Sequence, residues 1–460
     1  MRGADGRLNV TPAPGSLLSR RTANPGAVLA VGSLGVVLAF IDATIVNVAF
    51  PDIREDFPET SLDGLSWILN AYNILFAAFL VAAGRIADLV GRRRMFSIGV
   101  FVFTLASGLC AISPSVETLV ASRCLQAIGA AILVPASLAL VLEAYGAERR
   151  THAITLWTAN AVVAAGLGPS LGGLLVELGG WRLAFLINLP VGAIALVLAG
   201  RTMIESRAPG RRRMPDLIGA LMLAVGTGAL VLAIVKGGDW GWADVRVVAA
   251  FVAAAILLSL FVQRSTSHRA PMIDPTLLRS RALRVGNLLM LLGGAGFFAY
   301  TLCNVLFLTL VWDYSVLQAG LALTPGPFVA AAVAKPAEAL AERLGFAPMI
   351  AIGGVFWAAG VAYMASAVGP NADFVGEWLP GMGILGVGAG ICFPLIGSVA
   401  VGNAAGDLFA TASALQNVSR QLGAAIGVAI LVAIVGTPGA GELGDAFDRG
   451  WLFAAGCFLA

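Results

Sequence analysis

The segment AVLAVGSLGVVLAFIDATIVNVAF, residues 27–50, decides the fold, because it is an apolar run long enough to cross a bilayer and it carries a carboxylate inside. A transmembrane helix needs about 20 apolar residues to span roughly 30 Å of hydrocarbon. Asp42 lies about 15 residues into this run, and a charged Asp well inside a spanning helix costs about 2.5 to 3.5 kcal/mol. We therefore interpret Asp42 as a functional residue with a partner elsewhere in a helix bundle. The alternative is an Asp close enough to the outer surface to stay hydrated.

The composition is that of a polytopic membrane protein. Hydrophobic residues make up 58% of the 460 residues and charged residues 12%, which excludes a soluble globular chain. The net charge is only +3, and the arginines form short clusters between apolar runs, so we predict no nucleic-acid binding. The five cysteines fall in apolar runs, where cysteine acts as a small hydrophobic residue, and we expect no disulfides.

The apolar runs predict thirteen complete membrane spans and part of another, in an all-α chain. The complete spans are expected at residues 27–50, 67–83, 95–112, 119–142, 154–176, 183–203, 217–235, 245–262, 285–311, 321–340, 349–368, 379–401 and 408–435. Residues 451–460 resemble the opening half of a fourteenth span and are too short to cross. We therefore expect the natural protein to continue beyond this chain.

The basic residues predict which loops are cytoplasmic, because Lys and Arg near span ends stay on the cytoplasmic side. Every second connection carries an arginine cluster, at residues 92–94, 149–150, 207–213 and 264–284. The connections between these are acidic or aromatic, at residues 52–63, 239–244, 373–378 and 442–448. We therefore predict a multi-pass protein of the bacterial inner membrane with a cytoplasmic N-terminus, in which residues 1–26 form a disordered cytoplasmic tail.

Two glycine pairs indicate an internal repeat. Gly168 and Gly172 are four residues apart in the fifth span, and Gly423 and Gly427 are four apart in the thirteenth, a spacing that allows close helix approach. If spans one to six and nine to fourteen form two six-helix bundles, each pair lies on the fifth helix of its bundle. The predicted units are an N-terminal bundle (27–205), a basic loop with two inserted helices (206–264), a cytoplasmic connection (265–284) and a C-terminal bundle with an incomplete last helix (285–460).

The connection after the second span, GRIADLVGRRRMF at residues 84–96, resembles the signature of the major facilitator superfamily between helices two and three. Its elements are Gly84, Asp88, Gly91, Arg92 and Arg93. Glycine permits a short turn, and a carboxylate that pairs with arginine in one transport state acts as a conformational latch. The family pattern usually has a basic residue directly after the Asp, where this chain has a leucine. The alternative is simple positive-inside anchoring by the arginines.

Three further segments resemble the fourteen-helix drug/proton antiporters of that superfamily. They are IDATIVNVAFPDI at 41–53, RCLQAIGAAILVPAS at 123–137, and GLGPSLGG at 166–173 followed by GWRLAFLINLPVG at 180–192. The second matches the fourth-helix motif at Arg123 and Gln126, although Ala127 stands where glycine is usual. The match covers nearly the whole N-terminal half, whereas the C-terminal half agrees mainly in span count and in LQNVSRQLGAAIGVAI at 415–430. The resemblance implies the major facilitator fold and proton-coupled transport.

Helix depth links Asp42 to Arg123. The first span runs outward and places Asp42 about 22 Å along its axis, while the fourth runs inward and places Arg123 about 6 Å below its outer end. Both therefore lie in the outer half of the membrane. A nearby arginine favours the ionised form of a carboxyl and burial favours the neutral form, so movement changes its protonation. We predict that Asp42 carries the proton and that Arg123 tunes it; the alternative for Arg123 is extension to the outer interface.

Two further groups of residues are assigned by position. Pro169 removes a backbone donor and its neighbouring glycines remove side chains, which predicts an outer seal formed by Gly168, Pro169, Gly172 and Gly173, or else ordinary glycine-mediated packing. Arg420 lies near mid-membrane as a second buried charge, either lining a cavity or making a structural pair. The predicted central cavity is lined by Trp67, Asn70, Gln126, Asn160, Tyr300, Asn304, Asn417 and Arg420.

Motifs for chemistry are missing from the sequence. It has no G-x-x-x-x-G-K-[ST] loop, so ATP is not expected as the energy source. Its two histidines, His152 and His268, lie near cytoplasmic loops and predict no metal site. We therefore expect a monomer that is not an enzyme and that binds no cofactor, with a small molecule, protons and the bilayer as its partners.

The predicted function is proton-coupled efflux of drugs or other amphipathic small molecules by alternating access. One alternative keeps the fold and makes the protein a dedicated exporter of one endogenous metabolite or antibiotic. Another is a membrane sensor or scaffold that moves no solute. Neither the identity nor the charge of the substrate follows from the sequence.

Overall fold

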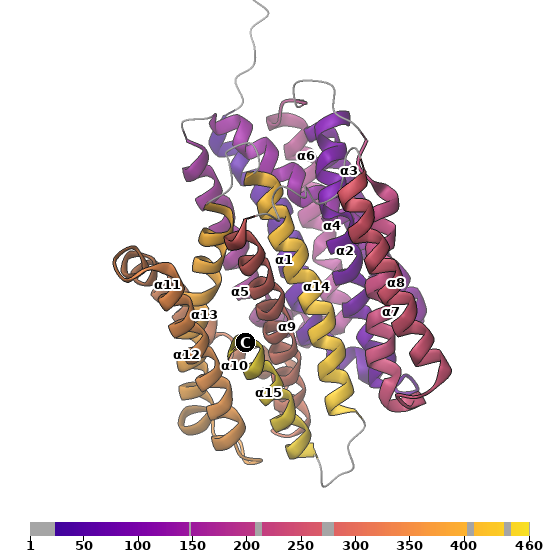
Figure 1. Ribbon diagram of the computed structural model, residues 1–460, viewed down its shortest axis with the longest axis vertical. Coiled ribbons are helices and arrows are strands. Elements are labelled where there is room, and N and C mark those ends of the chain that lie inside the picture. The colour runs from indigo at the N-terminus through magenta and orange to yellow at the C-terminus, as the bar shows by residue number, and fades with distance from the viewer. Residues whose placement is uncertain are drawn as a thin grey trace, which may run out of the picture.

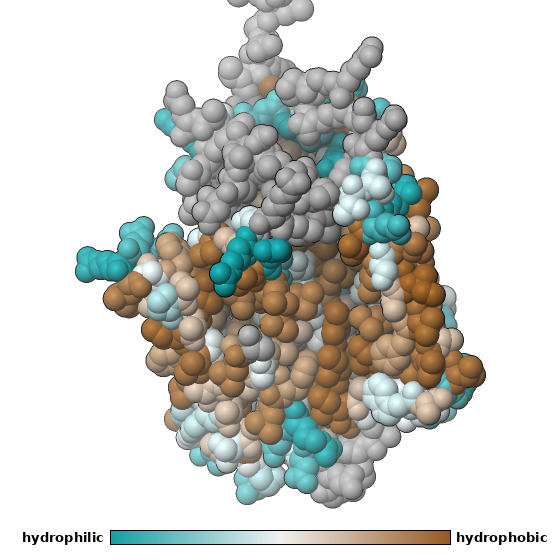
Figure 2. Space-filling view, viewed as in Figure 1, coloured by the Kyte–Doolittle hydropathy of each residue, from teal (hydrophilic) through white to brown (hydrophobic). Residues whose placement is uncertain are grey.

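The computed structural model describes residues 24–146, 149–207, 214–268, 280–402, 409–436 and 443–459, and these ranges are almost entirely helical. The predicted tail at residues 1–26 lies outside them except for its last three residues. On the face shown in Figure 2, apolar side chains form a belt across the middle of the molecule, and polar residues gather toward both ends. Large hydrophobic residues such as Phe101, Leu221 and Val252 are exposed in this belt. This surface suits a protein surrounded by lipid.

Six helices form the first bundle. They are α1 (Pro25–Asp56), α2 (Leu62–Val90), α3 (Arg92–Ala111), α4 (Val116–Tyr145), α5 (Arg150–Leu186) and α6 (Asn188–Thr202). Local sequence explains several of the helix starts. The side chain of Asn24 accepts a hydrogen bond from the Gly26 amide at the start of α1, and Ser115 with Thr118 forms a reciprocal capping box before α4.

The remaining helices comprise an inserted pair and a second bundle. The inserted pair is α7 (Leu217–Trp240) and α8 (Val245–Ser267). The second bundle contains α9 (Arg281–Leu310), α10 (Val316–Leu323), α11 (Pro325–Leu344), α12 (Phe346–Ala367), a single π-helical turn (Phe374–Trp378), α13 (Leu379–Gly402), α14 (Phe409–Val435) and α15 (Leu443–Leu459). Helices α10 and α11 together occupy the position of one predicted span.

The two bundles repeat the same packing. In the first, α1 packs on α5, α2 on α4, and α3 on α4 and α6; in the second, α9 packs on α14, α11 on α13, and α12 on α13 and α15 (Figure 1). The glycine pairs explain the α1–α5 and α9–α14 contacts. A Cβ at Gly172 would lie 3.2 Å from Ile45 Cα, and a Cβ at Gly427 would lie 2.5 Å from Ala295 Cα. Both predicted glycine pairs therefore occupy equivalent places in the repeat.

The inserted helices α7 and α8 pack on each other and, through α7, on α2 and α14. Asp216 caps α7 through the Gly219 amide, and its carboxylate is 2.8 Å from Nε of Arg264 on α8. Burial raises the pKa of Asp216, but these two hydrogen bonds outweigh it and lower that pKa below its ordinary value. On the other side of the membrane, Lys236 of α7 forms an ion pair with Asp63 of α2.

Within the described residues, twelve helical stretches are long and apolar enough to cross a membrane. The sequence predicted thirteen complete spans. The difference arises because the fifth and sixth expected spans are joined in one stretch, Gly166–Thr202. Gly179 and Gly180 leave the helical conformation inside it, and Gly180 has a φ of +70°, which favours glycine. The fourteen-helix arrangement remains a prediction.

The two bundles contact each other between α2 and α14 and between α5 and α10. A Cβ at Gly173 of α5 would lie 2.7 Å from Leu317 Cα of α10, and a Cβ at Gly320 would overlap the carbonyl oxygen of Pro169. Hydroxyl groups of Ser170 and Thr324 are 2.5 Å apart across this contact. Helix α11 extends away from the first bundle and packs mainly on α13 (Figure 1).

The α9–α14 contact predicts a large asymmetry between two glycine substitutions. Gly427→Ala inserts a methyl group against the Ala295 backbone, and overpacking of this kind costs about 1 to 3 kcal/mol. The midpoint of thermal unfolding of the purified protein should therefore fall. Gly383→Ala in α13 is the matched control, because a Cβ there meets nothing within 4 Å. Equal midpoints for the two variants would contradict this account of the packing.

Candidate functional site

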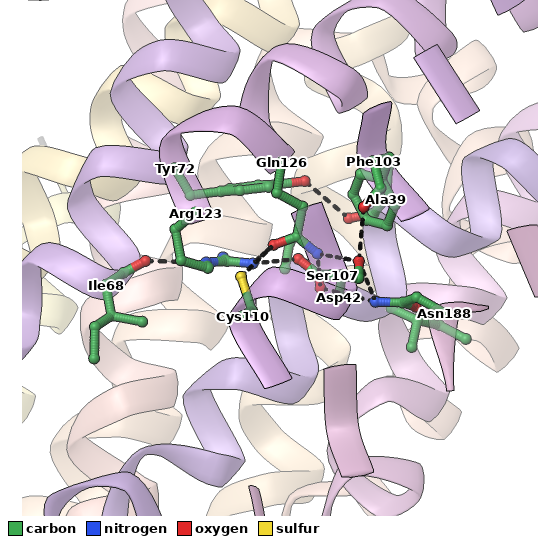
Figure 3. Close-up of polar contacts among 12 residues, drawn as sticks. Ala39, Asp42, Ile68, Tyr72, Phe103, Ser107, Cys110, Arg123, Gln126 and Asn188 are labelled. Carbon is green, nitrogen blue, oxygen red and sulfur yellow. Dashed lines mark hydrogen bonds and ion pairs between the residues drawn. The ribbon is translucent and has the colours of Figure 1, made fainter. Parts of the chain in front are cut away.

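Asp42 and Arg123 form an ion pair in the interior of the first bundle (Figure 3). Nη1 of Arg123 on α4 lies 2.5 Å from Oδ2 of Asp42 on α1, and each residue is 1% exposed. The sequence-based prediction that these two residues lie together therefore agrees with the geometry. The two alternatives, a hydrated Asp42 and an Arg123 extended to the outer interface, do not describe this structure.

Amide and hydroxyl groups complete the surroundings of the Asp42 carboxylate. Gln126 donates from Nε2 to Asp42 Oδ1 at 2.7 Å, and Asn188 of α6 donates from Nδ2 to the same oxygen at 3.2 Å. Ser107 of α3 accepts from both amides, at 2.8 and 3.2 Å. Helices α1, α3, α4 and α6 therefore meet at one carboxylate. The roles of Ser107 and Asn188 were missed in the sequence, although Asn188 lies in a segment typical of the antiporters.

The far side of the Arg123 guanidinium is enclosed by α2. Nε donates to the backbone carbonyl of Ile68 at 3.1 Å, and the guanidinium carbon lies 4.1 Å from the centre of the Tyr72 ring. Tyr72 in turn donates its hydroxyl to the carbonyl of Ala39 at 3.4 Å. Arg123 also donates to Oε1 of Gln126 at 2.5 Å. The arginine thus has an acceptor or a ring on each side and is shielded from solvent.

This arrangement links the protonation of Asp42 to helix packing. Two charges buried together repay their desolvation only when the remaining hydrogen-bonding groups are also satisfied. A proton added to the Asp42 carboxyl would convert an acceptor into a donor and would leave the buried Arg123 without its counter-charge. The contacts of α1 with α4 and α6 therefore depend on the ionisation of one group. No group of His, Cys, Asp or Glu residues within the described ranges has the arrangement of a metal site.

The predicted latch residues form a second polar cluster at the other end of α2. Arg92 donates from Nε and Nη2 to Asp88 Oδ1, at 3.0 and 2.9 Å, and its Nη1 lies 2.9 Å from Glu143 of α4. Gly91 allows the turn, with a φ of +136°, and Gly84 faces Pro135 of α4 closely, with 3.2 Å from a built Cβ to the proline Cβ. Through the contacts of Arg92 with Asp88 and Glu143, the cluster joins α2, α3 and α4 of the first bundle.

Glu205, just after α6, caps the start of α3. Its carboxylate accepts hydrogen bonds from the backbone amides of Arg93 and Arg94, at 3.1 and 3.0 Å. An anion at a helix N-terminus satisfies otherwise unpaired amides and is favoured by the helix dipole. Arg93 itself donates to the carbonyl of Gly200 at 3.1 Å. Sequence reasoning missed both Glu143 and Glu205, because each is distant in sequence from the motif that it contacts.

The four predicted outer-seal residues divide between two interfaces. Gly168 and Gly172 face α1 of their own bundle, whereas Gly173 faces α10 of the second bundle. Gly320 of α10 packs against the carbonyl oxygen of Pro169, and a side chain at position 320 would overlap that oxygen. The contact of α5 with α10 is therefore formed by residues 169–173. The glycines at 168 and 172 let the same segment pack closely against α1.

The predicted cavity residues do not line one space. Arg420 and Asn417 lie together on α14, with Nη2 of Arg420 3.3 Å from Asn417 Oδ1. Arg420 borders a small opening among α1, α2, α9 and α14. The other six residues have partners within a bundle. Trp67 packs in the core, Asn70 donates to Ser66, Asn160 donates to Ser33, and Gln126 belongs to the Asp42 site.

Tyr300 and Asn304 are buried inside the second bundle in this structure, and their role as cavity residues stays a prediction. Tyr300 donates to Sδ of Met382 at 2.9 Å, and Asn304 accepts from Nε1 of Trp451 at 2.7 Å. Their exposed fractions are 4% and 0%. A polar side chain at mid-membrane depth can find its hydrogen-bond partner on a neighbouring helix or in a water-filled cavity. Its depth alone does not distinguish these two environments.

Comparison with known proteins agrees with this architecture. The sequence pattern described as Major Facilitator Superfamily matches residues 32–428. The chain belongs to this superfamily. It is 35% identical over 405 residues to Multidrug resistance protein Stp of Mycobacterium tuberculosis (strain CDC 1551 / Oshkosh), covering 87% of this chain and 74% of that protein. It is 32% identical over 442 residues to Cephamycin export protein CmcT of Amycolatopsis lactamdurans, covering 93% of this chain and 90% of that one.

The fold is also similar to that of solved transporters of low sequence identity. The crystal structure of a variant of the nucleoside transporter NupG superposes with a TM-score of 0.62 at 12% identity, over 94% of this chain and 97% of that one. The superfamily and the relatives consist of transporters rather than enzymes, and this chain is accordingly a multi-pass membrane transporter of small molecules.

The buried pair predicts a non-additive response to mutation. Arg123→Met leaves a buried carboxylate without its counter-charge, which should cost about 3 to 5 kcal/mol. Combining it with Asp42→Asn removes both charges, so the double variant should melt at a higher temperature than Arg123→Met alone. The measurement is thermal unfolding of the two single variants and the double variant in the same detergent. Strictly additive shifts would show that the two side chains are not coupled.

Proposed function

We propose that this member of the superfamily exports amphipathic small molecules in exchange for protons by alternating access. The observation that carries the proposal is the fully buried Asp42 carboxylate held by Arg123, Gln126 and Asn188. An ionisable group at such a place in a membrane is expensive, and its usual role is in a proton or substrate pathway. The names of the two relatives, a multidrug resistance protein and an export protein, support the direction of transport.

The geometry of α1 supplies a route from proton binding to substrate binding. Asp42 faces the interior of the first bundle, while Ala39, Phe40 and Ala43 on the same helix line the opening beside Arg420. A change in the contacts of Asp42 with α4 and α6 therefore moves the wall of that opening. In the proposed cycle a proton reaches Asp42 from outside, favours release of substrate outward, and leaves on the inside after the bundles have moved.

The energy available is adequate for export. Each elementary charge that crosses a potential of 100 mV contributes about 2.3 kcal/mol, before any pH gradient is counted. The α5–α10 contact, with its glycines and the Ser170–Thr324 hydrogen bond, is the proposed outer seal. Because α11 extends away from the first bundle, we assign the structure to the state closed toward the outside. The arginine clusters in alternate loops support a cytoplasmic N-terminus, and we propose that the protein is a monomer in the bacterial inner membrane.

The arrangement of units follows from the repeated packing. We propose six-helix bundles at 27–205 and 285–460, with 206–264 inserted between them and 265–284 as a cytoplasmic connection, as in the fourteen-helix antiporter subgroup. The Asp88–Arg92–Glu143 cluster is the proposed latch, formed in this state and released in the other.

A second candidate function is export of a single compound. It is favoured by the similarity to a protein named for the export of cephamycin alone. Proteoliposomes with a proton gradient distinguish the two functions. A multidrug exporter moves several members of a panel of cationic, neutral and anionic fluorescent compounds, whereas a dedicated exporter moves one. A protein that moves none under any gradient would be neither.

Neutralising Asp42 should abolish gradient-driven efflux. Asp42→Asn retains the shape of the side chain and removes its titration, so the substrate gradient should no longer respond to an imposed pH difference in proteoliposomes. Asp56→Asn on the same helix is the matched control, because Asp56 is partly exposed and pairs with Arg182 at the end of α1. Its efflux should stay close to wild type. Unchanged efflux in Asp42→Asn would reject the proposed proton site.

Neutralising Asp88 should slow turnover with little effect on substrate affinity. A partly exposed ion pair contributes about 1 kcal/mol at most, so Asp88→Asn should lower the transport rate by up to about fivefold. Initial rates at several substrate concentrations separate the rate from the affinity. Asp244→Asn serves as control, because Asp244 is a partly exposed carboxylate that pairs with Arg246 outside the proposed latch. Wild-type rates in Asp88→Asn would remove the latch from the mechanism.

A further inference from the structure

Arg420 is a cation at mid-membrane depth for which the described residues supply no matching anion. It lies about 17 Å along α14 from the start of that helix. Its polar contact is the 3.3 Å hydrogen bond to Asn417 on the same helix, and its guanidinium carbon lies 5.1 Å from the centre of the Phe40 ring. No carboxylate in the described part of the chain lies within ion-pair distance of it.

The contrast with Arg123 shows how unusual this environment is. Arg123 has a carboxylate, a backbone carbonyl, an amide oxygen and an aromatic ring as neighbours. Arg420 has one amide oxygen and one ring. A charge at this depth is costly unless it is paired. The missing counter-charge therefore points to an anion that is not part of the described chain.

The space beside Arg420 is suited to an organic ligand. Phenylalanines from three helices, Phe40, Phe76, Phe297 and Phe298, line it together with small residues of α1. The amide of Gln421, which also lines the opening, already donates to Asn73 of α2 at 3.2 Å. The walls thus favour an apolar body, and the guanidinium favours a negative group on it.

We propose that Arg420 binds the anionic group of the substrate, and that the preferred substrates are amphipathic organic anions with a carboxylate or sulfonate on an aromatic or aliphatic body. The proposal rests on the transport function above for the cycle in which this site operates. A planar guanidinium can bind such a group through two parallel hydrogen bonds, and the phenylalanine rings contact the apolar part.

The charge of the substrate changes the electrical character of the cycle. When one proton enters for each molecule exported, a monoanion leaving and a proton entering move two positive charges inward. A monocation leaving in exchange for one proton moves none. Export of anions is therefore driven by the membrane potential as well as by the pH gradient, whereas one-for-one export of cations depends on the pH gradient alone.

The test compares two probes of the same shape and opposite charge, 2-naphthalenesulfonate and N,N,N-trimethyl-2-naphthylammonium. Equilibrium dialysis against the purified full chain in detergent gives Kd for each. Wild type should bind the sulfonate at least tenfold more tightly than the ammonium. Arg420→Gln should weaken sulfonate binding at least tenfold and leave ammonium binding unchanged, while Arg420→Lys should retain most of the sulfonate affinity. Arg246→Gln, at an exposed arginine of α8, should bind both probes like wild type.

Equal or tighter binding of the ammonium by wild type overturns the proposal, as does unchanged sulfonate binding by a folded Arg420→Gln. The wild-type comparison decides the matter if that variant does not fold. Sulfonate preference without gradient-driven transport in proteoliposomes supports the site and rejects the proposed function. Gradient-driven transport with no sulfonate preference keeps the function and rejects the anion site.

Discussion

The ion pair between Asp42 and Arg123 is the interaction on which the first bundle depends. Once two charges are placed in the middle of a bundle, the surrounding helices must supply the hydrogen bonds that bulk water would otherwise give. Gln126, Ser107 and Asn188 do so from α4, α3 and α6. The close contact of α1 with α5 then follows from glycines at 168 and 172, because larger residues there would push α1 away from this site.

The second bundle has the same packing and a different polar content. Glycines at 423 and 427 bring α14 against α9, as their counterparts bring α5 against α1. The interior that corresponds to the Asp42 region is apolar in α9, around Leu291 and Ala295. Its mid-membrane charge, Arg420, lies instead at the boundary with the first bundle. The repeat therefore fixes the backbone, while the two bundles provide a buried carboxylate on one side and a cation facing an opening on the other.

Much of this arrangement could be predicted from the sequence, because helix length and depth follow from apolar runs. Asp42, Arg123 and the glycine pairs were placed correctly by counting residues along spans. Ser107, Glu143 and Glu205 were missed because a small hydroxyl or a loop carboxylate has no periodic signal, and its partner is distant in sequence. The partners of Tyr300 and Asn304 inside the second bundle could not be predicted, because the depth of a residue in the membrane does not determine which way its side chain points. The number of spans differed because a kink at Gly179 and Gly180, without a polar loop, joins two of the predicted spans into one helical stretch.

Proton and substrate need not compete for one group in this molecule. A ligand shifts a conformational equilibrium only by its difference in affinity for the two states. Asp42 contacts α4 and α6, and a different side of α1 presents Phe40 to the opening next to Arg420. In the proposed cycle a proton on Asp42 alters one face of α1, and a substrate beside Arg420 alters another. Because both faces belong to one helix, the position of α1 is the quantity that each proposed ligand would bias, and the proposed coupling requires no direct contact between them.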